Sequence, residues 1–244
     1  VILCSVAGED VAAESLRSTL SAEGVEYAAT TANRPTASYV AVLDPGGGLF
    51  IGIADMEIYD TLGRSWAEEA AEAAAGADLW VVDANLPRAA LEALVEHSDV
   101  PVLGDPVSAA KAVRFSPILD RLAVIFPDRA EAAVLAGGEP SMPAANAAAM
   151  VEAGAATVVV ALGGDGAVFH GADAVETRPA ITPDAVVDVT GAGDALVAGY
   201  TWALAAGEND PLAWGLAAAS VAVETDASVS PELSEENLRK RLSR

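Results

Sequence analysis

Basic residues are scarce in this sequence of 244 residues, where 13 lysines and arginines stand against 36 acidic residues and give a formal net charge of −23. Lysine occurs only as Lys111 and Lys240. A protein that binds a nucleic-acid backbone needs a basic patch to neutralise phosphates, and this composition offers none. We therefore expect no nucleic-acid partner.

Long apolar runs are missing as well. The uncharged stretches Ala195–Gly207 and Pro211–Val223 contain thirteen residues each, whereas a helix that crosses a bilayer needs about 20. The sequence therefore predicts no membrane-spanning segment and no membrane partner. Cys4 is the single cysteine, so an intramolecular disulfide is excluded, and we expect a protein of a reducing, cytoplasmic compartment.

Hydrophobic residues make up 52% of the chain, a fraction too high for a disordered protein. From Leu79 onward, short β-branched runs alternate with segments of helical periodicity. Strands that alternate with helices at this spacing are typical of a parallel sheet with helices on both faces. We predict one α/β domain over residues 1–244, with a mostly parallel central sheet in a three-layer α/β/α arrangement.

The start of the chain carries a further strand and a hairpin that stands outside this rhythm. Val1–Val6 predicts a buried central strand. Tyr39–Leu43 and Leu49–Ile53 flank the glycine-rich segment Asp44–Gly48, and this pattern predicts an antiparallel hairpin. We interpret residues 35–56 as a small β lid beside the main sheet.

The segment Asp188–Leu196 is the strongest candidate for a chemical site. Thr190 could cap the following helix, and the glycines leave successive backbone N–H groups bare at its positive end, which favours anion binding. Asp194 in the first helical turn could accept a proton from an attacking hydroxyl, as phosphoryl transfer requires. An ordinary helix start is the alternative, although two glycines in a first turn disfavour it.

A dinucleotide-binding fingerprint is a second alternative for the same segment. Leu196 stands where that fingerprint has its third glycine, and the motif lies late in the chain, so an NAD-dependent oxidoreductase is disfavoured. The sequence also lacks the GK[ST] ending of a P-loop.

Asp188–Leu196 resembles the C-terminal DTxGAGD-type signature of the ribokinase-like (PfkB) carbohydrate kinases. Other stretches resemble this family in the same order along the chain: Pro127–Glu131 resembles its NxxE motif, Ala161–Gly166 its nucleotide-binding strand and turn, and Leu216–Val223 the helix that closes its adenine pocket. The resemblance covers almost the whole chain. It implies a ribokinase-like fold with a β lid.

Within the family, the resemblance is closest to pseudouridine kinases. Residues 35–39 and 53–60 resemble their lid, and Asp83–Pro87 and Asp105–Lys111 resemble their substrate-side loops. The implied activity is transfer of the γ-phosphoryl group of ATP to the 5′-hydroxyl of a nucleoside, pseudouridine. Another sugar kinase of the family, acting on ribose or fructose, is an alternative.

A chain that binds nucleotide without catalysis is a further alternative. The family's first strand with its sugar-binding aspartate, and the GG-x-x-x-N segment after it, have no counterpart here. The resemblance thus implies an N-terminally incomplete kinase domain.

The resemblance also assigns roles to individual residues. The expected catalytic residues are the base Asp194 and the anion-binding amides of Gly191, Ala192 and Gly193. The expected nucleotide contacts are Asp128, Gly163, Asp165, Gly166, Thr190, Leu216 and Ala219. The expected acceptor contacts are Thr36, Tyr39, Asp55, Asn85 and Lys111, and the expected metal-linked residues are Glu131 and Asp188.

Some of these assignments have a local alternative. Asp128 replaces the usual asparagine of NxxE, and Asp128 with Glu131 also predicts a variant capping box, so Glu131 is either linked to Mg²⁺ through water or only caps a helix. Lys111 is equally consistent with a solvated surface lysine. Asn85 follows the end of a predicted strand, where open α/β sheets bind ligands.

The implied cofactors are ATP and Mg²⁺, with a monovalent cation such as K⁺ near Asp188 and Thr190. The implied partners are a small nucleoside or sugar and a second copy of the chain, in a homodimer formed through the lid.

Overall fold

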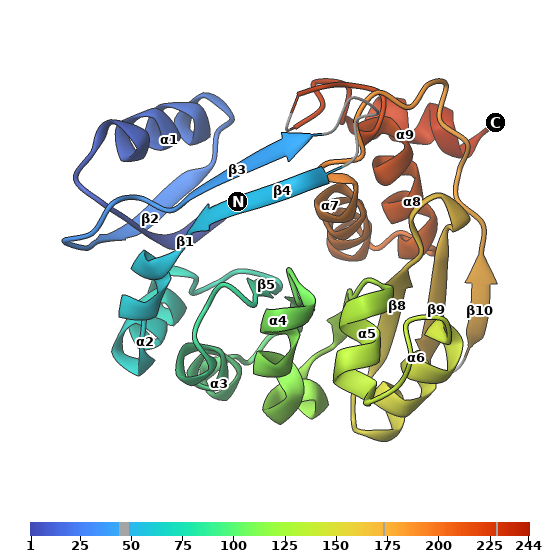
Figure 1. The fold of residues 1–244 in the computed structure, drawn as a ribbon, viewed down its shortest axis with the longest axis horizontal. Coiled ribbons are helices and arrows are strands. Elements are labelled where there is room, and N and C mark those ends of the chain that lie inside the picture. The colour runs from blue at the N-terminus through green and yellow to red at the C-terminus, as the bar shows by residue number, and fades with distance from the viewer. Residues whose placement is uncertain (44–48, 173, 228) are drawn as a thin grey trace. The chain divides into compact units, whose positions relative to one another are not determined.

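The structure, a computed structural model, describes residues 1–43, 49–172, 174–227 and 229–244 (Figure 1). The chain divides into two compact units, Val1–Val102 and Leu103–Arg244. The predicted turn at Asp44–Gly48 lies outside the described residues.

The first unit begins with a strand, a helix and a second strand. β1 (Ile2–Ala7) and β2 (Glu26–Thr31) form a two-stranded parallel sheet, and α1 (Val11–Ala22) connects them. The predicted first strand exists, but the prediction that it is a buried central strand is wrong, because Ile2 and Leu3 are 37% and 38% exposed. The strand β2 was not predicted.

The predicted antiparallel strand pair is confirmed. β3 (Ser38–Leu43) pairs with β4 (Leu49–Asp55) from Ser38 opposite Asp55 to Val42 opposite Ile51. Its action as a lid stays a prediction. The remaining elements of this unit are the 3₁₀ helix η1 (Glu57–Thr61), α2 (Arg64–Ala73), β5 (Trp80–Asp83) and α3 (Arg88–His97).

The main sheet has the strand order β10-β9-β8-β7-β6-β5. β6 and β7 are parallel, as are β7 and β8, whereas β8 with β9 and β9 with β10 are antiparallel. The predicted α/β fold is confirmed, with an antiparallel hairpin at one edge of the sheet (Figure 1). The strands of the second unit are β6 (Val102–Asp105), β7 (Val124–Ile125), β8 (Thr157–Ala161), β9 (Ala167–Gly171) and β10 (Val175–Arg178).

The helices of the second unit alternate with its strands from β6 to β8, and the last three helices follow β10. A buried apolar cluster that includes Trp214, Ala218 and Leu238 joins the last three helices to one another. None of the helices in the described ranges is long and apolar enough to cross a membrane. The helical elements are α4 (Ala109–Ala112), η2 (Val113–Arg121), α5 (Arg129–Ala136), α6 (Pro143–Glu152), η3 (Gly163–Asp165), α7 (Ala192–Ala206), α8 (Pro211–Ala222) and α9 (Glu235–Leu242).

Candidate functional site

The carboxyl ends of β6, β7 and β8 lie next to one another at one edge of the sheet. The N–H of Phe126 donates to the carbonyl of Gly104 at 2.9 Å, and the N–H of Ala161 donates to the carbonyl of Pro127 at 2.8 Å. The loops that follow these strands are therefore neighbours. Ligands of open α/β sheets bind at this edge.

The loop after β7 leads directly into a capping box. The Asp128 carboxylate accepts the N–H of Glu131, and the Glu131 Oε2 accepts the N–H of Asp128, both at 2.8 Å. The capping interpretation of this pair is confirmed. Any link of Glu131 to a metal ion stays a prediction.

Glu131 lies in the first turn of α5 and is buried, with 6% of its surface exposed. Burial above all, together with the nearby carboxylates of Asp128 and Asp105, raises the pKa of Glu131 to about 7, although the hydrogen bond from the Asp128 N–H acts in the opposite direction. A cation at this position would relieve the repulsion among the three carboxylates.

The carboxylates of Glu131 and Asp128 suit Mg²⁺ better than a metal ion whose ligands all come from the protein. Within the described ranges, no three His, Cys, Asp or Glu side chains lie together in a way that could hold a metal ion. Mg²⁺ commonly binds through one or two carboxylates, with water and substrate phosphates as its other ligands. Glu131 with Asp128 could supply that share.

The turn after β8 carries three of the expected nucleotide contacts. Asp165 is exposed and forms an ion pair with Arg129, at 2.7 Å between Oδ2 and Nη2. Gly166 has a φ of +100°, and a Cβ there would lie 2.0 Å from the carbonyl oxygen of Arg178, so backbone packing already requires glycine. Gly163 also has a positive φ, but its surroundings are open.

The Asp188–Leu196 segment forms a tight turn followed by helix α7. The Asp188 carboxylate accepts the N–H of Thr190 at 2.8 Å, and this bond holds the pKa of Asp188 below its usual value. The helix is capped by Gly191, which has a φ of +78°, and it has no side-chain cap. The predicted capping role of Thr190 is wrong, because Gly191 occupies the N-cap position and no side chain caps the helix.

The backbone N–H groups at the start of α7 differ in whether they already donate a hydrogen bond within the protein. The N–H of Ala192 donates to the carbonyl of Val189 at 3.3 Å within this turn. The N–H groups of Gly191 and Gly193 precede the first intrahelical bond, since the first four N–H groups of a helix have no carbonyl to bond inside it. A Cβ on Gly193 would meet no atom within 4 Å, so packing does not require glycine there.

The absence of a side chain at Gly193 therefore leaves the end of the helix open to a ligand. Asp194 lies beside it in the first turn of α7, with an exposed side chain. Backbone N–H groups at a helix N-terminus and a carboxylate are thus placed on one helical turn. This combination can hold a phosphoryl group and accept a proton.

The two adenine-side residues lie on helix α8. Leu216 is only 4% exposed, and Ala219, nearly one turn later, is half-buried. Ala219 is accordingly the more accessible of the two to a nucleotide. Both stay predicted contacts.

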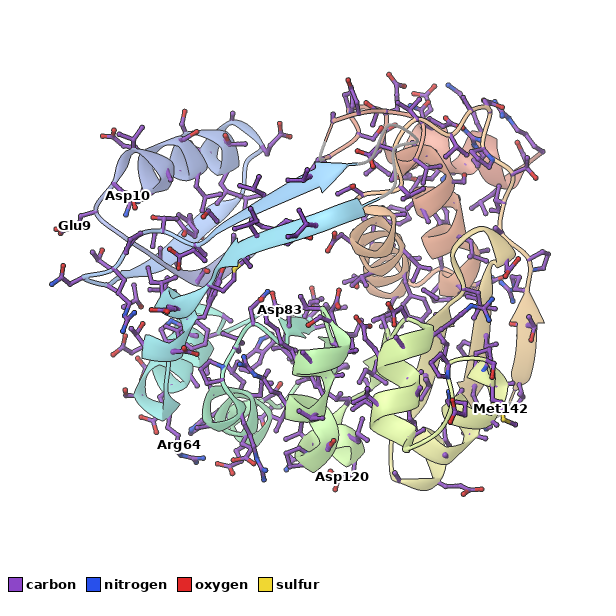
Figure 2. The ribbon with its side chains drawn as sticks, in the orientation of Figure 1. Glu9, Asp10, Arg64, Asp83, Asp120 and Met142 are labelled. Atoms are coloured by element: carbon purple, nitrogen blue, oxygen red, sulfur yellow. The ribbon has the colours of Figure 1, made fainter. Side chains whose placement is uncertain are left out.

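In the first unit, the buried Thr36 belongs to a hydrogen-bond network with Asp10, an exposed residue that caps the start of α1 (Figure 2). The Thr36 hydroxyl accepts the N–H of Gly8 at 2.9 Å and donates to Asp10 Oδ1 at 2.7 Å. The Asp10 carboxylate also accepts the N–H of Thr36 and of Ala13, and these bonds lower its pKa. The contacts support a structural role for Thr36.

A surface pocket of about 420 Å³ lies beside the end of β4. Asp55 lines it, and an ion pair of 2.7 Å between Arg34 and Glu57 lies at its wall. Tyr39, 53% exposed, lies on β3 with its ring over Gly52 of β4, where a Cβ would come within 2.3 Å of the Tyr39 hydroxyl oxygen. Asp55 is thus an expected acceptor residue that lines a pocket.

The last two acceptor residues are half-buried. Asn85 follows β5, and its N–H donates to the Asp83 carboxylate at 2.7 Å (Figure 2). Lys111 lies in the short helix α4 rather than in a loop. Val107, four residues before Lys111, has a φ of +64° and donates its N–H to the Asp105 carboxylate.

Two residues that contact expected site residues, Asp10 and Arg129, were not predicted from the sequence. Asp10 stands two residues after Gly8 and directly before a helical pattern, which is an N-cap signal. Arg129 carries no local signal, because its partner Asp165 is far away in the sequence.

Comparison with known proteins identifies similar chains. Residues 1–234 match the pfkB family of carbohydrate kinases. A pseudouridine kinase of Escherichia coli (strain K12) is 29% identical over 245 residues, which cover 97% of this chain and 78% of the relative. A carbohydrate kinase from Agrobacterium tumefaciens has a TM-score of 0.85 at 31% identity, covering 100% of this chain and 80% of that one.

The fold is shared with more distant structures. A putative ribokinase II from E. coli, solved in complex with ATP and Mg²⁺, has a TM-score of 0.85 at 17% identity and covers 100% of this chain and 83% of its own. The ribokinase-like fold predicted from the sequence is confirmed.

Proposed function

Since the chain belongs to the pfkB family of carbohydrate kinases, and is thus an ATP-dependent phosphotransferase with a hydroxyl acceptor, we propose that it phosphorylates pseudouridine on the 5′-hydroxyl. The similarity over 97% of the chain to a relative named pseudouridine kinase supports this acceptor. The start of α7, with an open Gly193 beside an exposed Asp194, carries the proposal of phosphoryl transfer.

In this mechanism, Asp194 accepts the proton of the acceptor hydroxyl as that oxygen attacks the γ-phosphorus. The N–H groups of Gly191 and Gly193 bind the γ-phosphoryl oxygens. The N–H of Ala192 binds them as well once its hydrogen bond to the carbonyl of Val189 opens. The positive end of the helix stabilises the charge that develops on these oxygens. The amides are placed before the reaction, so little reorganisation is needed during transfer.

Glu131, with Asp128, would hold Mg²⁺ through water. The ion would neutralise charge on the ATP phosphates. On the nucleotide side, Gly163, Asp165 and Ala219 are proposed contacts of ATP.

The turn at Asp188 is a proposed neighbour of a monovalent cation. Its carboxylate has a lowered pKa and stays ionised over the physiological range, which suits a cation. Such an ion would order the backbone of Thr190 and Gly191.

The strand pair β3/β4 supports a proposed homodimer. Val40, Val42, Ile51 and Ile53 lie on one face of the pair, because Val40 is opposite Ile53 and Val42 opposite Ile51. All four are between 40% and 58% exposed. A second copy of this apolar face would cover them.

The acceptor is tested with a panel of pseudouridine, uridine, ribose and fructose, following ADP release from ATP with Mg²⁺. We expect the highest kcat/KM for pseudouridine, with the phosphate on the 5′-oxygen. A higher kcat/KM for ribose or fructose would assign the chain to another substrate class of the same family.

A further inference from the structure

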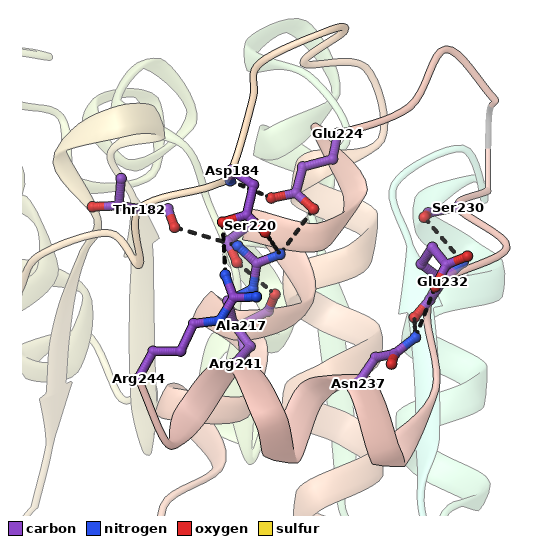
Figure 3. A network of polar contacts seen from close by, with 10 residues as sticks. All are labelled: Thr182, Asp184, Ala217, Ser220, Glu224, Ser230, Glu232, Asn237, Arg241 and Arg244. Carbon is purple, nitrogen blue, oxygen red and sulfur yellow. Dashed lines mark hydrogen bonds and ion pairs between the residues drawn. The ribbon is translucent and has the colours of Figure 1, made fainter.

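The segment between β10 and α7 carries the proposed phosphate-binding turn at its end, and polar contacts hold its middle part (Figure 3). The N–H of Val187 donates to the carbonyl of Val223, just after helix α8, at 2.8 Å. The next residue, Glu224, accepts the N–H of Asp184 on its Oε1. Two neighbouring residues after α8 thus fix this segment at two points.

Glu224 is itself held by an arginine from the last helix. Arg241 on α9 donates from Nη2 to Glu224 Oε2 at 2.8 Å and from Nη1 to the carbonyl of Thr182 at 3.3 Å. Its side chain is 6% exposed, and that of Glu224 is 22% exposed. The guanidinium also lies 3.6 Å from the Asp184 carboxylate, which Arg244 binds at 2.7 Å.

The geometry makes the Glu224 carboxylate a bridge. One of its oxygens binds the Arg241 guanidinium, and the other binds the backbone of the segment four residues before Asp188. Arg241 in addition contacts the same segment directly at Thr182. These contacts hold the Thr182–Asp184 backbone, which leads into the turn that ends at Gly191.

We propose that Arg241 is a positioning residue for the phosphate-binding turn Asp188–Gly191, acting through Glu224 and the Thr182–Asp184 backbone. This inference rests on the proposed function of that turn. Arg241 lies beyond residues 1–234, the part that matches the family, so the family pattern does not assign it.

The role of Arg241 depends on the planar geometry of its guanidinium. A guanidinium can bind a carboxylate and a carbonyl at the same time in a fixed plane, whereas a lysine ammonium is a single point charge on a flexible stem. Arg241→Lys would keep the charge that compensates Glu224 and lose one of the two contacts. The turn would then be displaced without the half-buried Glu224 carboxylate losing its compensating charge.

Arg241→Lys is therefore the test variant, and Arg239→Lys is its matched control. Arg239 lies on the same helix, pairs with Glu208 and Glu235, and is about half exposed. Hydrogen–deuterium exchange is measured on peptides that contain residues 184–190, relative to peptides from β8. Steady-state kinetics with ATP, Mg²⁺ and pseudouridine are measured alongside.

For Arg241→Lys we expect exchange at residues 184–190 to rise by about fivefold or more while β8 is unchanged. We expect kcat to fall by about 10-fold, because the turn is misplaced against the reacting group, with the KM for pseudouridine unchanged within about twofold. Arg239→Lys should leave exchange and kcat within about twofold of the wild type.

Unchanged exchange at residues 184–190 in Arg241→Lys would overturn the inference, as would faster exchange with an unaltered kcat. A wild-type protein that phosphorylates no acceptor would instead overturn the proposed function. In that case the exchange data alone decide whether Arg241 holds this segment.

Discussion

The carboxylates of Asp128 and Glu131 each accept the other residue's backbone N–H, both at 2.8 Å. The arrangement begins helix α5 and at the same time buries a carboxylate at the edge where the parallel strands end. Burial raises the pKa of Glu131 to about 7. One local motif therefore supplies a helix cap and a carboxylate suited to a cation.

The raised pKa of Glu131 predicts a stability that falls with rising pH. Between the usual pKa of a glutamate and about 7, the native state binds more protons at Glu131 than the unfolded state does. Its contribution is full below the unfolded pKa and is lost as pH rises through the folded pKa. The slope is at most about 1.4 kcal/mol per pH unit.

Glu131→Gln removes this titration and keeps an oxygen for the Asp128 N–H. We expect the free energy of unfolding, measured by urea titration without ATP or metal at pH 5 to 8, to decline less steeply in the variant than in the wild type. If the free energy of unfolding depends on pH equally in the two proteins, the pKa of Glu131 is not raised in the native state.

Gly193 and Gly191 should respond to alanine with opposite changes in stability. Gly193→Ala replaces a helical glycine in open space and should stabilise the protein by about 0.5 kcal/mol. Gly191→Ala places a side chain at a φ of +78° and should cost about 1 kcal/mol. Thermal unfolding measures both.

Both alanine variants should lower kcat, because a methyl group or a shifted backbone would occupy the space for the phosphoryl oxygens. A Gly193→Ala protein that gains stability and keeps its full kcat would show that no phosphate approaches this amide.

Thr36→Val is expected to destabilise the first unit by about 1–3 kcal/mol, because the buried N–H of Gly8 loses its acceptor. The exposed Thr31, at the end of β2, is the control, and Thr31→Val should change stability by less than about 0.5 kcal/mol. Chemical denaturation checks both values. A Thr36→Val protein of normal stability with a raised KM for the nucleoside would instead support direct contact with the acceptor.

Ile53→Lys tests the proposed dimer. A lysine in the middle of the apolar face of β3/β4 would place a charge in the interface, so we expect a monomer by sedimentation velocity at a concentration where the wild type is dimeric. Val175→Lys, at an equally exposed valine on β10, should leave the dimer intact. Identical sedimentation of all three proteins would contradict an interface at this face.

Much of the second unit could be predicted from local signals. The strand at Thr157–Ala161 is a run of β-branched residues, and helix α8 begins with an aspartate cap and a proline in its first turn. Such signals depend only on residues close together in the sequence. The structure has both elements where they were predicted. The start of α5 was equally predictable from the spacing of Asp128 and Glu131.

Contacts between distant segments were not predictable in the same way. The pair Arg129–Asp165 and the contact of Arg241 with Glu224 depend on how whole elements pack. Strand β2 was missed because its sequence, EYAATT, has alanines in place of a strong apolar alternation. Thr190 was assigned to the cap because its residue type favours it, but a glycine with a positive φ overrides that preference.

The most direct test of the account follows the transfer itself. Wild-type protein and the Asp194→Asn variant are incubated with ATP, Mg²⁺ and pseudouridine, and ³¹P NMR follows the products. We predict that the wild type forms one 5′-phosphomonoester for each ADP, and that Asp194→Asn binds ATP within a few-fold of the wild type but turns over about 10²–10⁴ times more slowly. A variant that keeps more than about a tenth of the wild-type kcat, or a wild type that makes no phosphomonoester, would contradict the central claim.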